Sequence, residues 1–267
     1  MNFYAQQRRN RRLTALLIAA FLALFTALGV GLDVTVLGYG TGGTALPYVS
    51  LIALTVATGI SALGFRHGAD WVMTAMLAEP LRPDDAEHRE LQNIATEIAI
   101  AAGLPRPRLL VIPDPAPNAL AAGRDPTHAT IAVTSGALAL LDREQTQGVV
   151  AHEMAHIGNR DTLVMTMVSV LFGGVIMLAD WARRSMALGR SPRGGGQIPL
   201  LILVGGLVLV SPLLSRLLSL AVSRRREYQA DATAVALTRN PEGLARALET
   251  IAASRSPLRA ATRSTAH

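Results

Sequence analysis

The stretch LTALLIAAFLALFTALGVGL, residues 13–32, holds 20 consecutive positions without a charged side chain. An α-helix of that length crosses the hydrocarbon core of a bilayer. Four arginines precede it, whereas the following segment, Asp33 to Leu46, has no basic residue, which places the N-terminus in the cytoplasm. The alternative is a cleaved secretory signal with Ala27 and Gly29 near its cleavage site, although the run is longer than such signals usually are.

A second uncharged run, Pro47 to Phe65, is followed by Arg66 and His67, a basic flank that suits the cytoplasmic side. Residues 1–66 are therefore predicted to form a membrane hairpin whose spans cover about 13–32 and 47–65. The chain as a whole is half hydrophobic and only 16% charged, which is more apolar than an ordinary soluble domain.

Two further apolar runs cover Leu163 to Leu178 and Ile198 to Leu214, the latter extending to Val222. We expect this pair, within residues 162–222, to cross the membrane twice, because helices this apolar have no partner surface in so short a chain. The Gly-rich linker between them, Arg183 to Gln197, carries four arginines and no acid, which argues against an outside position. A hairpin packed on the polar domain or half-sunk in the interface is the alternative.

Charge and cysteine content restrict the possible partners. All 25 basic residues are arginine, they form no aromatic-interleaved patch, and several flank apolar runs, where they suit anionic headgroups. Membrane lipid is therefore the expected partner and nucleic acid is not. Because the chain has no cysteine, any metal must be bound by histidine and carboxylate side chains.

Between the second and third runs the composition is that of a soluble domain. Asp84 to Ala102 predicts an amphipathic helix that ends at Gly103. A small sheet is predicted from three short stretches: Arg108 to Ile112, Ala119 to Ala122, and Ala129 to Thr134. Two more helices are predicted from their caps, one from Asp142 with Gln145 to about Ile157, stopped by Gly158 and Asn159, and one that begins at Asn240.

The sequence VAHEMAHI, residues 150–157, lies on the helix predicted after Asp142. His152 and His156 are four residues apart, so both imidazoles lie on one face and one zinc ion could take a nitrogen from each. Glu153 would then reach the attacking water and act as the general base of peptide hydrolysis. The pattern predicts one catalytic zinc per chain, against the alternative of a chance match on an ordinary helix.

A catalytic zinc needs a third protein ligand and one open position. Glu227 is the candidate ligand, and Asp231 and Asp161 are candidates for the partners that orient the histidines. The competing interpretation of Glu227 and Asp231 is a solvated helix face beside three arginines. Isolated histidines are alternative ligands, at positions 67, 88 and 128.

Three stretches resemble the HtpX heat-shock family of bacterial membrane zinc proteases. They are GVVAHEMAHIGNRD at 148–161, SRRREYQAD at 223–231 and NPEGLARAL at 240–248; NALAAG at 118–123 matches more loosely. With two apolar runs before the His-Glu helix and two after it, the similarity covers nearly the whole chain.

The resemblance implies a mainly α membrane protein with about four apolar helices and a gluzincin-like α+β metalloprotease domain. It implies that His152, His156 and Glu227 bind zinc and that Glu153 is catalytic. The protease domain, 67–161, would face the cytoplasm of a bacterial inner membrane, and the helices of 223–267 would supply the third ligand. The expected substrates are misfolded or damaged membrane proteins, as part of a stress response.

The resemblance also makes Asn118 and Ala119 the start of an edge strand that pairs with substrate backbone. Leu120 and Ala122 depart from the aromatic and hydroxyl residues usual there, which bears on the pocket's preference. An intramembrane metalloprotease is a second possible function, although charged residues bound the His-Glu helix on both sides. A membrane scaffold that keeps a structural zinc is a third, and it would need a fourth protein ligand. The oligomeric state is not encoded visibly.

Overall fold

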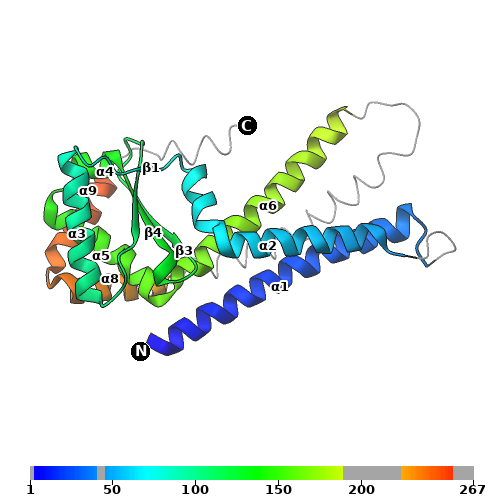
Figure 1. The fold of residues 1–267 in the computed structure, drawn as a ribbon, viewed down its shortest axis with the longest axis horizontal. Helices are drawn as coiled ribbons and strands as arrows, with labels where there is room; N and C mark the ends of the chain where they lie inside the picture. The colour runs from blue at the N-terminus through cyan, green and yellow to red at the C-terminus, as the bar shows by residue number, and fades with distance from the viewer. Residues whose placement is uncertain (1–2, 41–45, 189–223, 255–267) are drawn as a thin grey trace. The chain divides into compact units, whose positions relative to one another are not determined.

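The computed structural model describes residues 3–40, 46–188 and 224–254, which form a mainly helical chain with one small sheet (Figure 1). The chain divides into two compact units. The first contains Met1–Arg11, Arg66–Thr166 and Ser223–His267, and the second contains Arg12–Phe65 and Met167–Val222. The mainly α class with a small sheet is confirmed.

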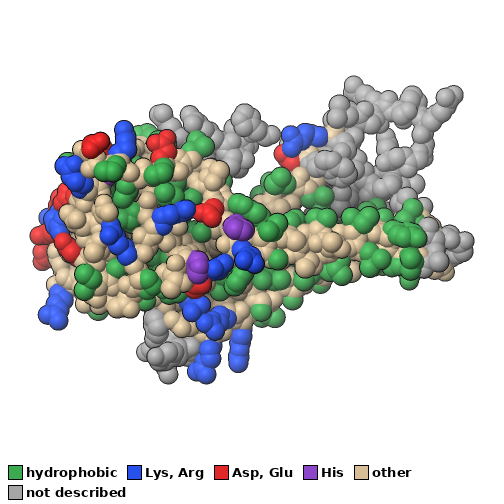
Figure 2. All heavy atoms as spheres, in the orientation of Figure 1, with side chains coloured by type: hydrophobic (Ala, Val, Ile, Leu, Met, Phe, Trp, Pro, Cys, Tyr) green, Lys and Arg blue, Asp and Glu red, His purple; other side chains and the backbone are tan. Residues whose placement is uncertain are grey.

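Long apolar helices make up the second unit. Three helices of the described chain are long and apolar enough to cross a membrane: α1 (Phe3–Val36), α2 (Tyr48–Ala75) and α6 (Asp161–Leu188). Large hydrophobic side chains such as Leu16, Ile52 and Met177 are exposed on them, and Figure 2 shows hydrophobic side chains along the long helices. Such surfaces suit lipid. The fourth predicted run, 198–222, lies outside the described residues.

The connection between the first two spans differs from the prediction. The loop was expected to begin at Asp33, but α1 continues through Asp33 to Val36. The Asp33 carboxylate is buried and accepts hydrogen bonds from the backbone N–H groups of Val49 and Ser50, both at 2.9 Å, and from the Ser50 hydroxyl at 2.8 Å. Asp33 thus satisfies the first amides of α2 from a neighbouring helix, which explains a buried acid in an apolar segment. Gly29 allows the close approach, because a Cβ there would lie 2.4 Å from the Ser50 Cα.

A four-stranded mixed sheet organises the first unit. The three predicted strands are confirmed as β2 (Arg108–Ile112), β3 (Ala119–Gly123) and β4 (Ala129–Thr134). The two-residue strand β1 (Glu79–Pro80) was not predicted, since so short a segment has no pattern of its own. The order is β1-β2-β4-β3, with β2 parallel and β3 antiparallel to β4. Strand β3 therefore forms one edge.

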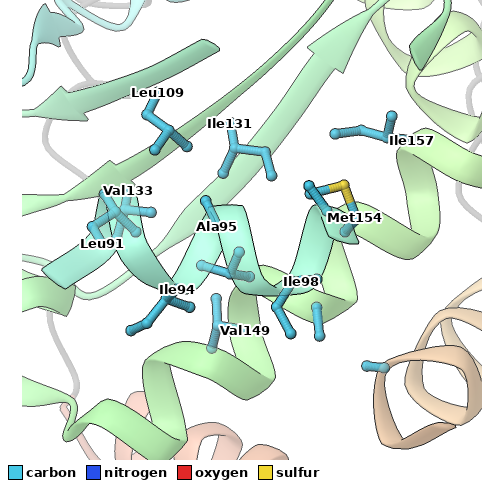
Figure 3. Close-up of a cluster of buried hydrophobic side chains, with 14 of the residues drawn as sticks. Leu91, Ile94, Ala95, Ile98, Leu109, Ile131, Val133, Val149, Met154 and Ile157 are labelled. Carbon is cyan, nitrogen blue, oxygen red and sulfur yellow. The ribbon is translucent and has the colours of Figure 1, made fainter. Parts of the chain in front are cut away.

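Helices pack on this sheet through one hydrophobic core (Figure 3). This core contains residues of α3 (Ala86–Ala102), α5 (Arg143–Asn159), α8 (Arg224–Thr238), α9 (Pro241–Ala253) and the short helix α4 (Ser135–Leu140). A short 3₁₀ helix, η1 (Pro126–His128), precedes β4 and has no buried residue. Ile98 of α3, Ile131 of β4 and Met154 of α5 are almost fully buried in this core. Burial of each such side chain contributes about 1.5–3 kcal/mol, so α5 is held firmly by one of its faces.

Both ends of α5 are capped. Asp142 and Gln145 form the predicted capping box. The predicted stop at Gly158 and Asn159 was wrong by one or two residues: both are helical, and the left-handed turn falls on Arg160, with φ of 60°. In that turn the Arg160 N–H still bonds to the carbonyls of His156 and Ile157, so the helix ends in a left-handed residue that is not glycine.

Candidate active site

The two histidines of α5 project from one face of the helix. His152 Nε2 and His156 Nε2 lie 3.1 Å apart, and their side chains are only 17% and 15% exposed. The spacing follows from the helix itself, since residues four apart lie one turn apart on the same face. The opposite face of α5 carries Val150, Met154 and Ile157 into the core, which fixes the direction in which the imidazoles point.

Helix α8 brings Glu227 to these histidines. Its Oε2 lies 3.5 Å from His152 Nε2 and 3.6 Å from His156 Nε2. The approach depends on the packing of α8 against α5, in which Ala230 and Ala234 are completely buried. Within the described part of the chain, these three residues form the one group of His and acidic side chains close enough to hold a metal ion.

The spacing of the three ligand atoms fits a tetrahedral zinc ion. Bonds of about 2.0–2.1 Å at tetrahedral angles separate any two ligand atoms by about 3.3–3.4 Å. The distances of 3.1, 3.5 and 3.6 Å bracket that range. Two imidazoles and one carboxylate are also the ligand types of catalytic zinc sites, which leave one position open. The residues present therefore fit the metal.

Two further carboxylates lie beside the Nδ1 atoms of the imidazole rings, on the side away from Glu227. Asp161 Oδ2 lies 3.2 Å from His156 Nδ1, and Asp231 Oδ1 lies 2.9 Å from His152 Nδ1. A carboxylate beside Nδ1 favours the tautomer with its proton there, which leaves the Nε2 lone pair for a metal. Asp161 is almost completely buried, whereas Asp231 is half-exposed.

The electrostatic field of the site favours a cation between the ligands. Burial alone would lower the pKa of His156, but hydrogen bonds with Asp161 and Glu227 and the charge of Glu153 outweigh it and raise the pKa to about 10. The hydrogen bond with His156 in turn lowers the pKa of Glu227, which keeps that side chain ionised. A metal ion would take the place of the proton that the cluster otherwise holds.

Glu153 lies beside the ligands and at the edge of the sheet. Burial raises the pKa of its carboxyl, although the charges of His156 and His152 and a hydrogen bond from the Ala121 backbone N–H act in the other direction. A carboxylate whose pKa is raised by burial accepts a proton more readily than an exposed one, which suits a general base. The Ala121 contact also indicates that the open edge of β3 faces this residue.

The other histidines considered from the sequence have different surroundings. His88 is buried at the start of α3, where its Nδ1 accepts the Arg82 backbone N–H. His128 is bound to Asp125 and Arg124, at 2.8 Å each. His67 is exposed on α2. None of the three belongs to the group of potential metal ligands found among the described residues.

Sequence reasoning missed two contributors to this region. Ala121 is an alanine in a strand, and only the pairing of β3 with β4 reveals that its amide points outward. Asn10 stands between arginines before the first span and was not a candidate, yet it hydrogen-bonds to Asp161. The available signal was the spacing of three uncharged polar residues, Gln6, Asn10 and Thr14, at intervals of four among the arginines. The structure buries all three.

Comparison with known proteins identifies the family. The model of Peptidase family M48 matches residues 85–266. A protease HtpX homolog of Caldanaerobacter subterraneus is 37% identical over 270 residues, covering 99% of this chain and 87% of the relative. A protease HtpX homolog of Pyrococcus furiosus is 38% identical and covers 92% of this chain and 82% of the relative. The chain therefore belongs to peptidase family M48 and, within it, to the HtpX proteases, which makes it a membrane-associated metallopeptidase.

Proposed function

We propose that this protein is a zinc-dependent endopeptidase that binds one zinc ion through His152, His156 and Glu227. The observation that carries the proposal is the spacing of the three ligand atoms, which suits a tetrahedral ion with one open position. Asp161 and Asp231 would orient the two imidazoles. A scaffold with a structural zinc would need a fourth protein ligand, and the described residues offer three.

Glu153 is the proposed general base. When bound, zinc would supply the positive charge that acidifies the attacking water and polarises the scissile carbonyl. The Glu153 carboxylate takes the proton from that water and then donates it to the leaving amine. Its burial supports this role, because a less solvated carboxylate accepts a proton more readily.

We further propose that substrate pairs with the open edge of β3. The backbone groups of Asn118 face β4: the N–H donates to the Thr134 hydroxyl, and the carbonyl accepts from the Thr134 amide. Backbone groups alternate in direction along an antiparallel strand, so those of Ala119 and Ala121 point away from β4. Their N–H groups already donate to Asn118 Oδ1 and to Glu153, so the carbonyls of these two residues, the first of them a candidate from the sequence, would accept the amides of an extended peptide beside Glu153.

Backbone pairing can be tested with peptide substrates methylated at one amide at a time. Methylation removes a donor, so alternate positions of the peptide should raise KM, while the positions between them should leave KM unchanged. Cleavage of each peptide by the detergent-purified chain gives both constants. A KM that rises at no position, or at neighbouring positions equally, would argue against strand addition.

The expected substrates are misfolded or damaged proteins of a bacterial inner membrane, cleaved on the cytoplasmic side. In support, the candidate span of α6 begins at Asp161, the residue that contacts His156, so this ligand lies close in sequence to a candidate membrane segment. The arginines before the first span favour a cytoplasmic position for the protease domain. Helix α5 packs among α3, α8, α9 and β3 and is not a candidate span, which disfavours an intramembrane protease.

Metal removal tests the zinc assignment directly. We expect the detergent-purified full chain to contain about one zinc per chain and to cleave casein. A chelator should abolish cleavage because the ligands then lack the ion, and stoichiometric zinc should restore it. Metal content by atomic absorption and gel-based cleavage are the measurements. Full cleavage by a chain shown to hold no metal would overturn the proposal.

A further inference from the structure

The C-terminal end of α5 is covered by two side chains from α1. Gln7 Nε2 donates to the Gly158 carbonyl at 2.9 Å, and Asn10 Nδ2 donates to the Asn159 carbonyl at 3.0 Å. These carbonyls belong to the last turn of the helix, where acceptors have no partner within the helix itself. Residues that precede the first span thus cap the helix that carries both histidines.

Asn10 makes a second contact that Gln7 does not. Its Nδ2 also donates to Asp161 Oδ1 at 2.7 Å. Asn10 is 1% exposed and Asp161 is 2% exposed, so this bond to a carboxylate is shielded from water. Hydrogen bonds to an ionised acceptor in such surroundings are among the strong ones. The exposed arginines on both sides of Asn10 show that its burial is specific to that position.

The two oxygens of Asp161 connect Asn10 with a candidate metal ligand. Oδ1 accepts from Asn10, while Oδ2 lies 3.2 Å from His156 Nδ1. Because the carboxylate is planar and rigid, a constraint on Oδ1 also limits where Oδ2 can lie. The buried guanidinium of Arg226, whose Nε is 3.9 Å from Oδ1, approaches the same oxygen from α8.

We propose that Asn10 is a positioning residue for the metal site: it fixes the Asp161 carboxylate, which in turn orients the His156 imidazole toward zinc. This inference rests on the proposed zinc function. By this inference, a residue that precedes the first apolar run influences how tightly zinc is bound. A protease domain that lacks residues 1–11 would therefore bind zinc less tightly than the full chain.

A purely structural role for Asn10 makes a different prediction. If Asn10 only attached α1 to the end of α5, Gln7 would have the same role. Loss of either side chain would then alter the stability of the protein without altering its affinity for zinc. Gln7 is the matched control, since it donates to the adjacent carbonyl and no bond to Asp161 is seen for it. Leucine at position 10 keeps the branched shape of asparagine, although it is larger and cannot hydrogen-bond. Leucine at position 7 likewise removes the amide of Gln7.

The experiment uses the full chain in detergent and measures the zinc dissociation constant by competition with a chelator, with the spectrum of bound cobalt as a second readout. Asn10→Leu should weaken zinc binding on the order of tenfold, the lower end of what loss of an outer partner costs, because it acts through Asp161. Gln7→Leu should leave the constant at the wild-type value. Asp161→Asn should weaken binding at least as much as Asn10→Leu does, and adding Asn10→Leu to it should change little further.

Three results would overturn the inference: a wild-type constant in Asn10→Leu, an equal loss in Gln7→Leu, or full additivity of Asn10→Leu with Asp161→Asn. If Asn10→Leu does not fold, Asn10→Ala gives the same comparison. His156→Ala separates this inference from the proposed function. Loss of zinc in His156→Ala with no effect at Asn10 rejects only the inference, whereas unchanged zinc in His156→Ala rejects both.

Discussion

Replacement of Glu153 by Gln is expected to lower the rate of peptide cleavage by roughly 10²–10⁴-fold, the usual contribution of a general acid–base group. The amide keeps the size of the side chain but cannot accept the proton of the attacking water. Zinc content should be unchanged, because Glu153 lies beside the ligands and is not one of them. Casein cleavage and metal content, measured on the same detergent-purified preparation, test both statements.

Glu144→Gln is the matched control for this substitution. It makes the same chemical change on the same helix, at an exposed position whose carboxylate pairs with Arg246 at 2.7 Å. Its cleavage rate should equal that of the wild type. Equal rates for Glu153→Gln and the wild type would exclude Glu153 as the general base.

Replacement of Glu227 by Ala is expected to weaken zinc binding by more than about a hundredfold, since loss of a direct ligand should exceed the cost of losing an outer partner. The two imidazoles would remain, but two ligands leave the ion without the third bond of a catalytic site. Cleavage should be lost with the metal and should return in part at high zinc concentration. Chelator competition and a zinc titration of the cleavage rate measure these effects.

Glu249→Ala, an exposed acid of α9, serves as the control for the loss of one negative charge. It should bind zinc as the wild type does. If Glu227→Ala kept wild-type affinity, the third ligand would have to be a different residue. Comparison of the two variants distinguishes the loss of a ligand from a general change in charge.

Several helices, strands and helix caps could be predicted because they depend on residues close together in the sequence. The first two apolar runs became helices, and the predicted strands appeared at β2, β3 and β4, because run length, apolarity and the Pro and Gly residues between the strands act over short distances. The capping box at Asp142 and the cap at Asn240 were predictable for the same reason. The ends of α1 at Val36 and of α5 at Asn159 were not predictable in this way, because Asp33 and the Asn159 carbonyl make hydrogen bonds with other parts of the chain.

The sequence by itself determined the apolar runs that became α1, α2 and α6, the helix that carries His152 and His156, and the type of metal they suit, because each depends on neighbouring residues in one helix. Only the tertiary structure decided that Glu227 meets both imidazoles, since its position depends on the packing of α8 against α5. The same holds for Ala121 and Asn10, whose contacts with Glu153 and Asp161 join segments far apart in the chain. A local pattern contains no information about such contacts, because they arise from the burial of separate helices and strands in a shared core.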